Sequence, residues 1–114
     1  MQSRQAVFNL SLISTKIMVQ GEKLSVLSAK DGREYGTFCP ELDLVTEMDT
    51  PEEAIKDLIE SIKDYADEYI NELELYSKSP NRAHHLPYIE AVKACKTNWD
   101  IRLLMEIKHG SVHV

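Results

Sequence analysis

The stretch TPEEAIKDLIESIKDYADEYINEL, residues 50–73, decides the fold of this chain. Thr50 can cap the free amides of a helix, Pro51 loses no hydrogen bond at the first helical position, and Glu53 can complete a capping box. Apolar residues then recur at spacings of three and four: Ile55, Leu58, Ile59, Ile62, Tyr65, Ala66, Tyr69, Ile70 and Leu73. This period predicts an amphipathic helix of about seven turns that ends before the breaker cluster at residues 79–81.

The opposite face of this helix is strongly acidic. Residues 51–76 carry nine acids and two lysines, a charge of −7, in a chain whose net charge is −6. Such a surface repels nucleic-acid phosphates and attracts a basic protein. We therefore expect a macromolecular partner to bind five acids that follow one another along the helix: Glu53, Asp57, Glu60, Asp64 and Asp67.

Alternating apolar and polar residues before the helix predict β-strands. The segments are Phe8–Leu12, Ile17–Val19, Lys23–Lys30, Arg33–Cys39 and Leu44–Glu47. Asp31-Gly32 joins the third segment to the fourth and favours a type I′ hairpin, in which both central residues have positive φ. Pro40 has no amide to donate to a sheet, so the fourth strand should end before it.

The C-terminal third predicts two further helices. Pro87 marks the start of the first, at residues 87–97, and a capping box from Thr97 to Asp100 starts the second, at residues 98–109. Trp99, Leu103, Leu104 and Ile107 fit this second helix, and its apolar positions Leu103, Leu104, Met105 and Ile107 suit packing. An alternative makes residues 101–108 a strand, and residues 111–114 fit a short edge strand. Because this third of the chain carries a charge of +3, DNA binding through its two helices is a second functional hypothesis.

A third hypothesis is a metal-dependent nuclease or hydrolase. Asp43, Glu47 and Asp49 are close in sequence, and carboxylates at this density can hold Mg²⁺ or transfer protons. The histidines (His84, His85, His109 and His113) and the cysteines (Cys39 and Cys95) show no spacing typical of a metal site or a nucleophile. We expect exposed loop acids, ordinary imidazoles and buried thiols instead, and therefore no enzyme, no catalytic residues, no metal and no cofactor.

The chain as a whole fits one small α+β domain, residues 1–114, because strand patterns come first and helical patterns follow. No apolar run approaches the roughly 18 residues that span a bilayer. The N-terminus lacks the apolar centre of a signal peptide. We therefore expect a cytoplasmic protein.

The run FCPELDLVTEMDTPEEA, residues 38–54, resembles the HicB-like antitoxin family. That family has an Asp-Gly hairpin, a CPELD corner, a short strand and a GDTPEEA helix start. Tyr35 lies where the family commonly has an aromatic residue, whereas Met48 replaces the usual glycine and indicates a different turn. The resemblance covers about residues 22–76 and leaves residues 80–114 as a C-terminal helical extension.

The resemblance implies a degenerate ribonuclease-H-like fold that has lost its catalytic acids. It implies a small antiparallel sheet of three to four strands with the long helix packed on one face. It also implies that the protein binds and blocks a small basic toxin that cleaves mRNA, which agrees with the acidic helix. A homodimer or higher oligomer is expected, because so small a sheet has unpaired edges. Nothing after Asn81 matches a family DNA-binding module, so the chain resembles a stand-alone relative.

Overall fold

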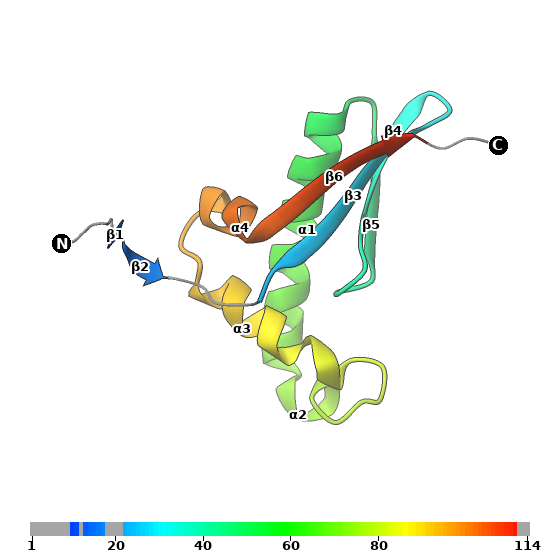
Figure 1. Ribbon diagram of the computed structural model, residues 1–114. Coiled ribbons are helices and arrows are strands. Elements are labelled where there is room, and N and C mark those ends of the chain that lie inside the picture. Colours follow the sequence, from blue (N-terminus) through cyan, green and yellow to red (C-terminus); the bar gives the residue numbers. More distant parts are fainter. Residues whose placement is uncertain (1–9, 12, 18–21, 112–114) are drawn as a thin grey trace.

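The computed structural model describes residues 10–11, 13–17 and 22–111 (Figure 1). Its strands are β1 (Leu10–Ser11), β2 (Ile13–Ile17), β3 (Leu24–Asp31), β4 (Glu34–Cys39), β5 (Leu44–Met48) and β6 (Met105–Ser111). Its helices are α1 (Pro51–Asn71), α2 (Leu73–Tyr76), the 3₁₀ turn η1 (Ala83–His85), α3 (Leu86–Ala94) and α4 (Asn98–Leu104). The expected α+β class is confirmed. Among these described residues, no helix is long and apolar enough to cross a membrane.

The main sheet has four strands in the order β5-β4-β3-β6. β3 pairs with β4, and β4 with β5, in the expected antiparallel way. α1 packs on one face of this sheet, as expected (Figure 1). β1 and β2 form a separate two-stranded sheet. Two N-terminal strands are expected at residues 8–12 and 17–19. Of these residues, five lie outside the described part of the chain: 8, 9, 12, 18 and 19.

The last element corrects the expected helix at residues 98–109. The helix α4 ends at Leu104, and β6 continues from Met105 as a strand parallel to β3. The free edge of β3 decides this, because Leu24 to Lys30 pair with Met105 to Ser111 along their whole length. Met105 is buried and the next residue, Glu106, is exposed, which is the alternation of a strand. The alternative strand is therefore confirmed from residue 105 onward, and residues 112–114 lie outside the described part.

The hairpin between β3 and β4 is confirmed, but its expected turn type is wrong. Asp31 pairs with Glu34, so Gly32 and Arg33 are the two central residues. Gly32 has φ +67°, and Arg33 is not among the described residues with positive φ. A type I′ turn needs positive φ at both positions, whereas a type II′ turn needs it only at the first. The glycine therefore occupies the one position that requires it.

The helix α1 begins as its sequence indicates. The Thr50 hydroxyl accepts a hydrogen bond from the amide of Glu53 at 3.1 Å, and Pro51 is the first helical residue. The Glu53 carboxylate accepts from the Thr50 hydroxyl at 3.1 Å. The helix ends at Asn71, and the short α2 follows it, so the helical run ends before residue 79 as expected.

The core lies between α1 and the sheet. From α1, Leu58, Ile62 and Tyr69 are fully buried, and Leu24 and Val26 of β3 face them in the same cluster. The C-terminal segment closes this core from the side with five more buried apolar residues: Ile89, Val92, Ile101, Leu104 and Met105. Among the described elements no helix packs on the other face of the sheet, where Leu27 and Val45 are 48% and 65% exposed.

Candidate partner-binding surface

The five acids expected to bind a partner lie along one stripe of α1. Their spacings of four and three residues place them on one side of the helix, because a turn takes 3.6 residues. Four of them are exposed and Asp57 is half-buried. The structure therefore brings Glu53, Asp57, Glu60, Asp64 and Asp67 together on solvent-facing helix surface, called the acidic stripe below.

The C-terminal segment binds α1 along the side next to this stripe. A nitrogen of the Arg102 guanidinium lies 2.6 Å from the Glu52 carboxylate, and the Lys93 ammonium lies 2.6 Å from Asp67. Arg102, through its hydrogen bond and its charge, holds the pKa of Glu52 below its usual range. Ion pairs this exposed contribute little to stability. They orient the segment along the helix. Two members of the acidic stripe already have charged partners within the chain, Asp67 with Lys93 and Glu60 with Lys63.

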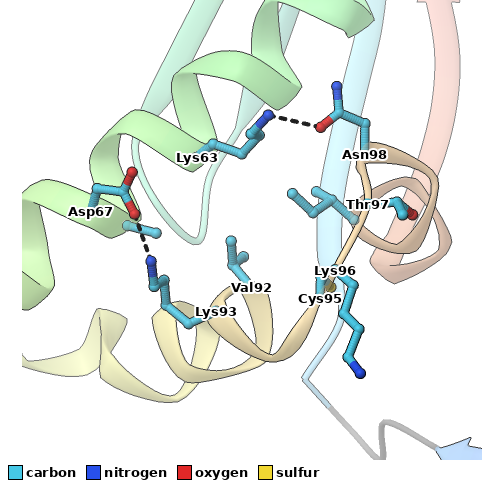
Figure 2. Close-up of a pocket in the computed structure, with 10 residues that line it drawn as sticks. Lys63, Asp67, Val92, Lys93, Cys95, Lys96, Thr97 and Asn98 are labelled. Carbon is cyan, nitrogen blue, oxygen red and sulfur yellow. Dashed lines mark hydrogen bonds and ion pairs between the residues drawn. The ribbon is translucent and has the colours of Figure 1, made fainter.

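A small cleft of about 150 Å³ separates α1 from the connection between α3 and α4 (Figure 2). Asn98 crosses its rim, where it accepts a hydrogen bond from Lys63 and donates one to Glu60, both at 2.9 Å. Cys95 lines the cleft, and burial raises the pKa of its thiol to about 11. A thiol that stays protonated is a poor nucleophile. The polar contacts at this cleft therefore hold two elements together and do not form a reaction site.

A second groove, of about 260 Å³, lies between α1 and α4. It is lined by Lys56, Ile59, Glu60, Asn98, Trp99 and Arg102. Trp99 is 66% exposed, and Leu103, one turn further along α4, is 58% exposed. The expectation that Leu103 packs inward is wrong, because α4 directs Ile101 and Leu104 into the core instead. Sequence reasoning missed this apolar surface beside the acidic stripe.

A larger cleft, of about 640 Å³, lies between the β4–β5 corner and the C-terminal half of α1. In its wall the Tyr65 hydroxyl lies 2.6 Å from Nδ1 of His85. The Arg82 guanidinium lies over the rings of Tyr65 and Tyr76, at 5.5 and 4.6 Å from their centroids. Burial lowers the pKa of His85, so the imidazole is neutral near pH 7. These contacts tie the loop after α2 to α1.

The three histidines that the structure describes do not converge on a single point. His84 and His85 are adjacent at the larger cleft, His109 lies exposed on β6, and His113 is outside the described residues. Within the described part of the chain, no group of three or more His, Cys, Asp or Glu side chains is placed to hold a metal ion. A metal centre therefore has no support from this geometry.

The acids of the nuclease hypothesis are also spread apart. Asp43 lies in the turn before β5, with φ +58°, and Glu47 lies four residues further along this extended strand. Four residues of strand span about 13 Å, and Asp49 follows the end of β5. Cys39 is buried, and desolvation raises the pKa of its thiol to about 11. Neither the carboxylates nor the thiol form a catalytic set.

The two C-terminal helices do not have the form that the DNA-binding hypothesis requires. The second of them, α4, has only seven residues and passes directly into β6. Two of its residues, Ile101 and Leu104, are buried in the core, and Arg102 is paired with Glu52. A recognition helix must present its side chains to the bases of a groove. The short α4 commits Ile101, Arg102 and Leu104 to contacts within the chain instead.

The described part of this molecule therefore defines a small two-layer α+β protein with an acidic helical surface beside an apolar groove. Residues 2–107 match the PHD_like family, described as the antitoxin of a RelE / RelB toxin-antitoxin system. Because the match covers almost the whole chain, this protein belongs to that antitoxin family.

A solved structure from Syntrophomonas wolfei subsp. wolfei, described as an antitoxin part of a toxin/antitoxin system, is similar to this chain. The TM-score is 0.71 and the sequence identity 25%. The similarity covers 77% of this chain and 64% of the other, so this chain spans less than two thirds of that protein. No curated protein matches this chain significantly.

Proposed function

We propose that this antitoxin neutralises a small basic toxin that cleaves mRNA, and that it does so by binding alone. The acidic stripe on α1 carries the proposal, since α1 holds seven acids against two lysines and so has a charge of −5. A surface of this sign attracts a basic protein and raises its rate of association. Catalysis and a cofactor have no part in this function, and the site of action is the cytoplasm, where mRNA is cleaved.

The finer features of the proposal come from the resemblance at residues 38–54. We assign residues 22–76 to a HicB-like core, which in this structure comprises β3, β4, β5, α1 and α2. Self-association as a homodimer or higher oligomer completes the proposal. It is supported by the outer edges of β5 and β6, which no described strand covers.

Charge-neutral variants of the acidic stripe test this function. The triple variant Glu53→Gln, Asp57→Asn, Asp64→Asn removes three charges but leaves Glu60 and Asp67, which hold the C-terminal segment. Its matched control removes three exposed charges elsewhere on the chain: Asp31→Asn, Glu34→Gln, Glu106→Gln.

The probe is the cognate toxin purified from the same organism, and the readouts are its dissociation constant and the rescue of growth on co-expression. We expect the triple variant to bind about tenfold more weakly or worse, and the control to bind like the wild type. The wild-type affinity should also fall as salt rises, because exposed charges are screened. Equal affinity of the two variants would remove the acidic stripe from the proposal. A wild-type chain that does not bind the toxin would refute the function.

A further inference from the structure

The single tryptophan of this chain lies on the surface, and the fold places it there. A complete capping box at the start of α4, in which Thr97 and Asp100 bond reciprocally, fixes where this helix begins. With that start, Ile101 and Leu104 enter the core, so Trp99 and Leu103 must face outward, at 66% and 58% exposure. Large exposed apolar side chains that lie together mark interaction sites. Tryptophan is also among the residues most enriched where binding energy concentrates.

The groove beside Trp99 has an apolar floor. Ile59 of α1, which is 5% exposed, lies between the two helices that form it. Trp99 forms one wall, and Leu103 extends the apolar surface one turn along α4. A partner's apolar side chain placed there would contact Ile59 and the indole ring together, and both would lose exposed surface.

The lining of the groove holds two cations and one acid, and the negative charge beside it comes from Glu52 and the acidic stripe. Lys56 and Arg102 line it, but the Arg102 guanidinium lies 2.6 Å from Glu52. Lys56 has Glu52 one turn before it and Glu60 one turn after it on the same helix. The acidic stripe borders the groove on its outer side. An apolar side chain with basic neighbours therefore matches both the groove and its rim.

A second copy of this chain matches the same surface poorly. In a twofold-symmetric dimer the patch on one protomer faces the same patch on its partner. Two copies of the acidic stripe would then be brought into one interface, and like charges brought together oppose association. Charge complementarity therefore selects a basic partner over another copy.

Resting on the proposed function, we infer that the α1–α4 groove receives an apolar side chain of the basic toxin, with Trp99 as the central contact. Basic residues that flank this side chain in the toxin then meet the acidic stripe. Binding then depends on an apolar contact at Trp99 as well as on the charge of the acidic stripe. It also assigns the α4 segment, which lies outside the HicB-like core, a direct part in binding.

Three variants in the full chain test the groove. Trp99→Ala removes the central contact, Trp99→Phe keeps an aromatic ring, and Leu103→Asp places a charge on the apolar surface. The control is Val45→Ala, because Val45 is 65% exposed on the open face of the sheet, away from α1. Each variant is checked for the wild-type circular dichroism spectrum. Toxin affinity is then measured by calorimetry, and oligomeric state by light scattering.

We expect Trp99→Ala to weaken binding about 30-fold or more, as for a central interface residue. Trp99→Phe should retain part of the affinity, Leu103→Asp should bind weakly, and Val45→Ala should equal the wild type. If the wild type binds the toxin but Trp99→Ala and Leu103→Asp bind equally well, the groove is not the site and the antitoxin function stands. If these variants lose only an oligomer, a second copy occupies the groove and the inference fails. No binding by the wild type refutes the proposed function itself.

Discussion

Replacing Thr46 with Val is expected to destabilise the fold, because its buried hydroxyl joins two strands to the helix. Thr37 of β4 and Thr46 of β5 are 2% and 6% exposed, and their hydroxyl oxygens are 2.5 Å apart. The Thr46 hydroxyl also lies 2.8 Å from the backbone carbonyl oxygen of Ala54, to which it donates. A hydroxyl has one proton, so Thr37 must be the donor in the bond between the two threonines.

The magnitude follows from what each substitution leaves unpaired. Thr46→Val keeps the shape of the side chain but leaves the buried Thr37 hydroxyl without its acceptor and removes a bond to Ala54. Leaving a buried polar group unsatisfied costs about 1–3 kcal/mol, and this loss is expected here. Thr37→Val leaves Thr46 still bonded to the Ala54 carbonyl, so a loss of about 1 kcal/mol is expected. The double variant should lose less than the sum of the two, because no hydroxyl is then left unpaired.

Urea unfolding followed by circular dichroism measures all four chains of this double-mutant cycle. With a slope of about 1–3 kcal/mol/M for a protein of this size, Thr46→Val should lower the midpoint by about 1 M at an unchanged slope. An unchanged midpoint for Thr46→Val would refute the assigned bonds. Strict additivity in the double variant would show that the two hydroxyls are not coupled.

Three further predictions concern buried polar and titratable groups. Burial lowers the pKa of His85 below 6.5, so the stability that its neutral form contributes is complete above pH 6.5 and declines as the pH falls further. The urea midpoint should therefore drop between pH 7.5 and pH 5. The drop should be smaller in His85→Gln than in the control His84→Gln. Thiol pKa values of about 11 for Cys39 and Cys95, against 9.0 ordinarily, reduce the thiolate fraction about 100-fold, so maleimide labelling at pH 7.5 should be slow until urea unfolds the chain. Tyr69→Phe removes a hydrogen bond to a backbone carbonyl and should cost about 1 kcal/mol by the same urea assay.

Local signals predicted the first half of the fold well because each depends on neighbouring residues. Thr50 and Pro51 define where α1 begins, and Gly32 marks the hairpin, although the turn type depended on which residues paired across it. Residues 105–111 could not be assigned in the same way. Their apolar residues suit a helix as well as a strand, and only the free edge of β3, distant in sequence, decides between the two.

The candidate site also combines one feature that local sequence determines with one that tertiary packing determines. The acidic stripe was predictable, because helical period alone places Glu53, Asp57 and Asp64 on one side of α1. The groove was not, because the direction in which Trp99 points depends on how α4 packs against α1. An apolar residue in a short amphipathic stretch is indistinguishable in sequence from a core residue until that packing is known.

The ends of α4 explain how so short a helix can present a binding surface. Seven residues alone do not form a stable helix in water. Here the Thr97–Asp100 capping box fixes one end, and the pairing of Met105 with Leu24 fixes the other. The backbone that carries Trp99 is therefore fixed before any partner arrives, and little backbone entropy remains to be lost there on binding. The parallel strand β6 thus supports the proposed toxin site from a distance, because it sets where α4 ends beside α1.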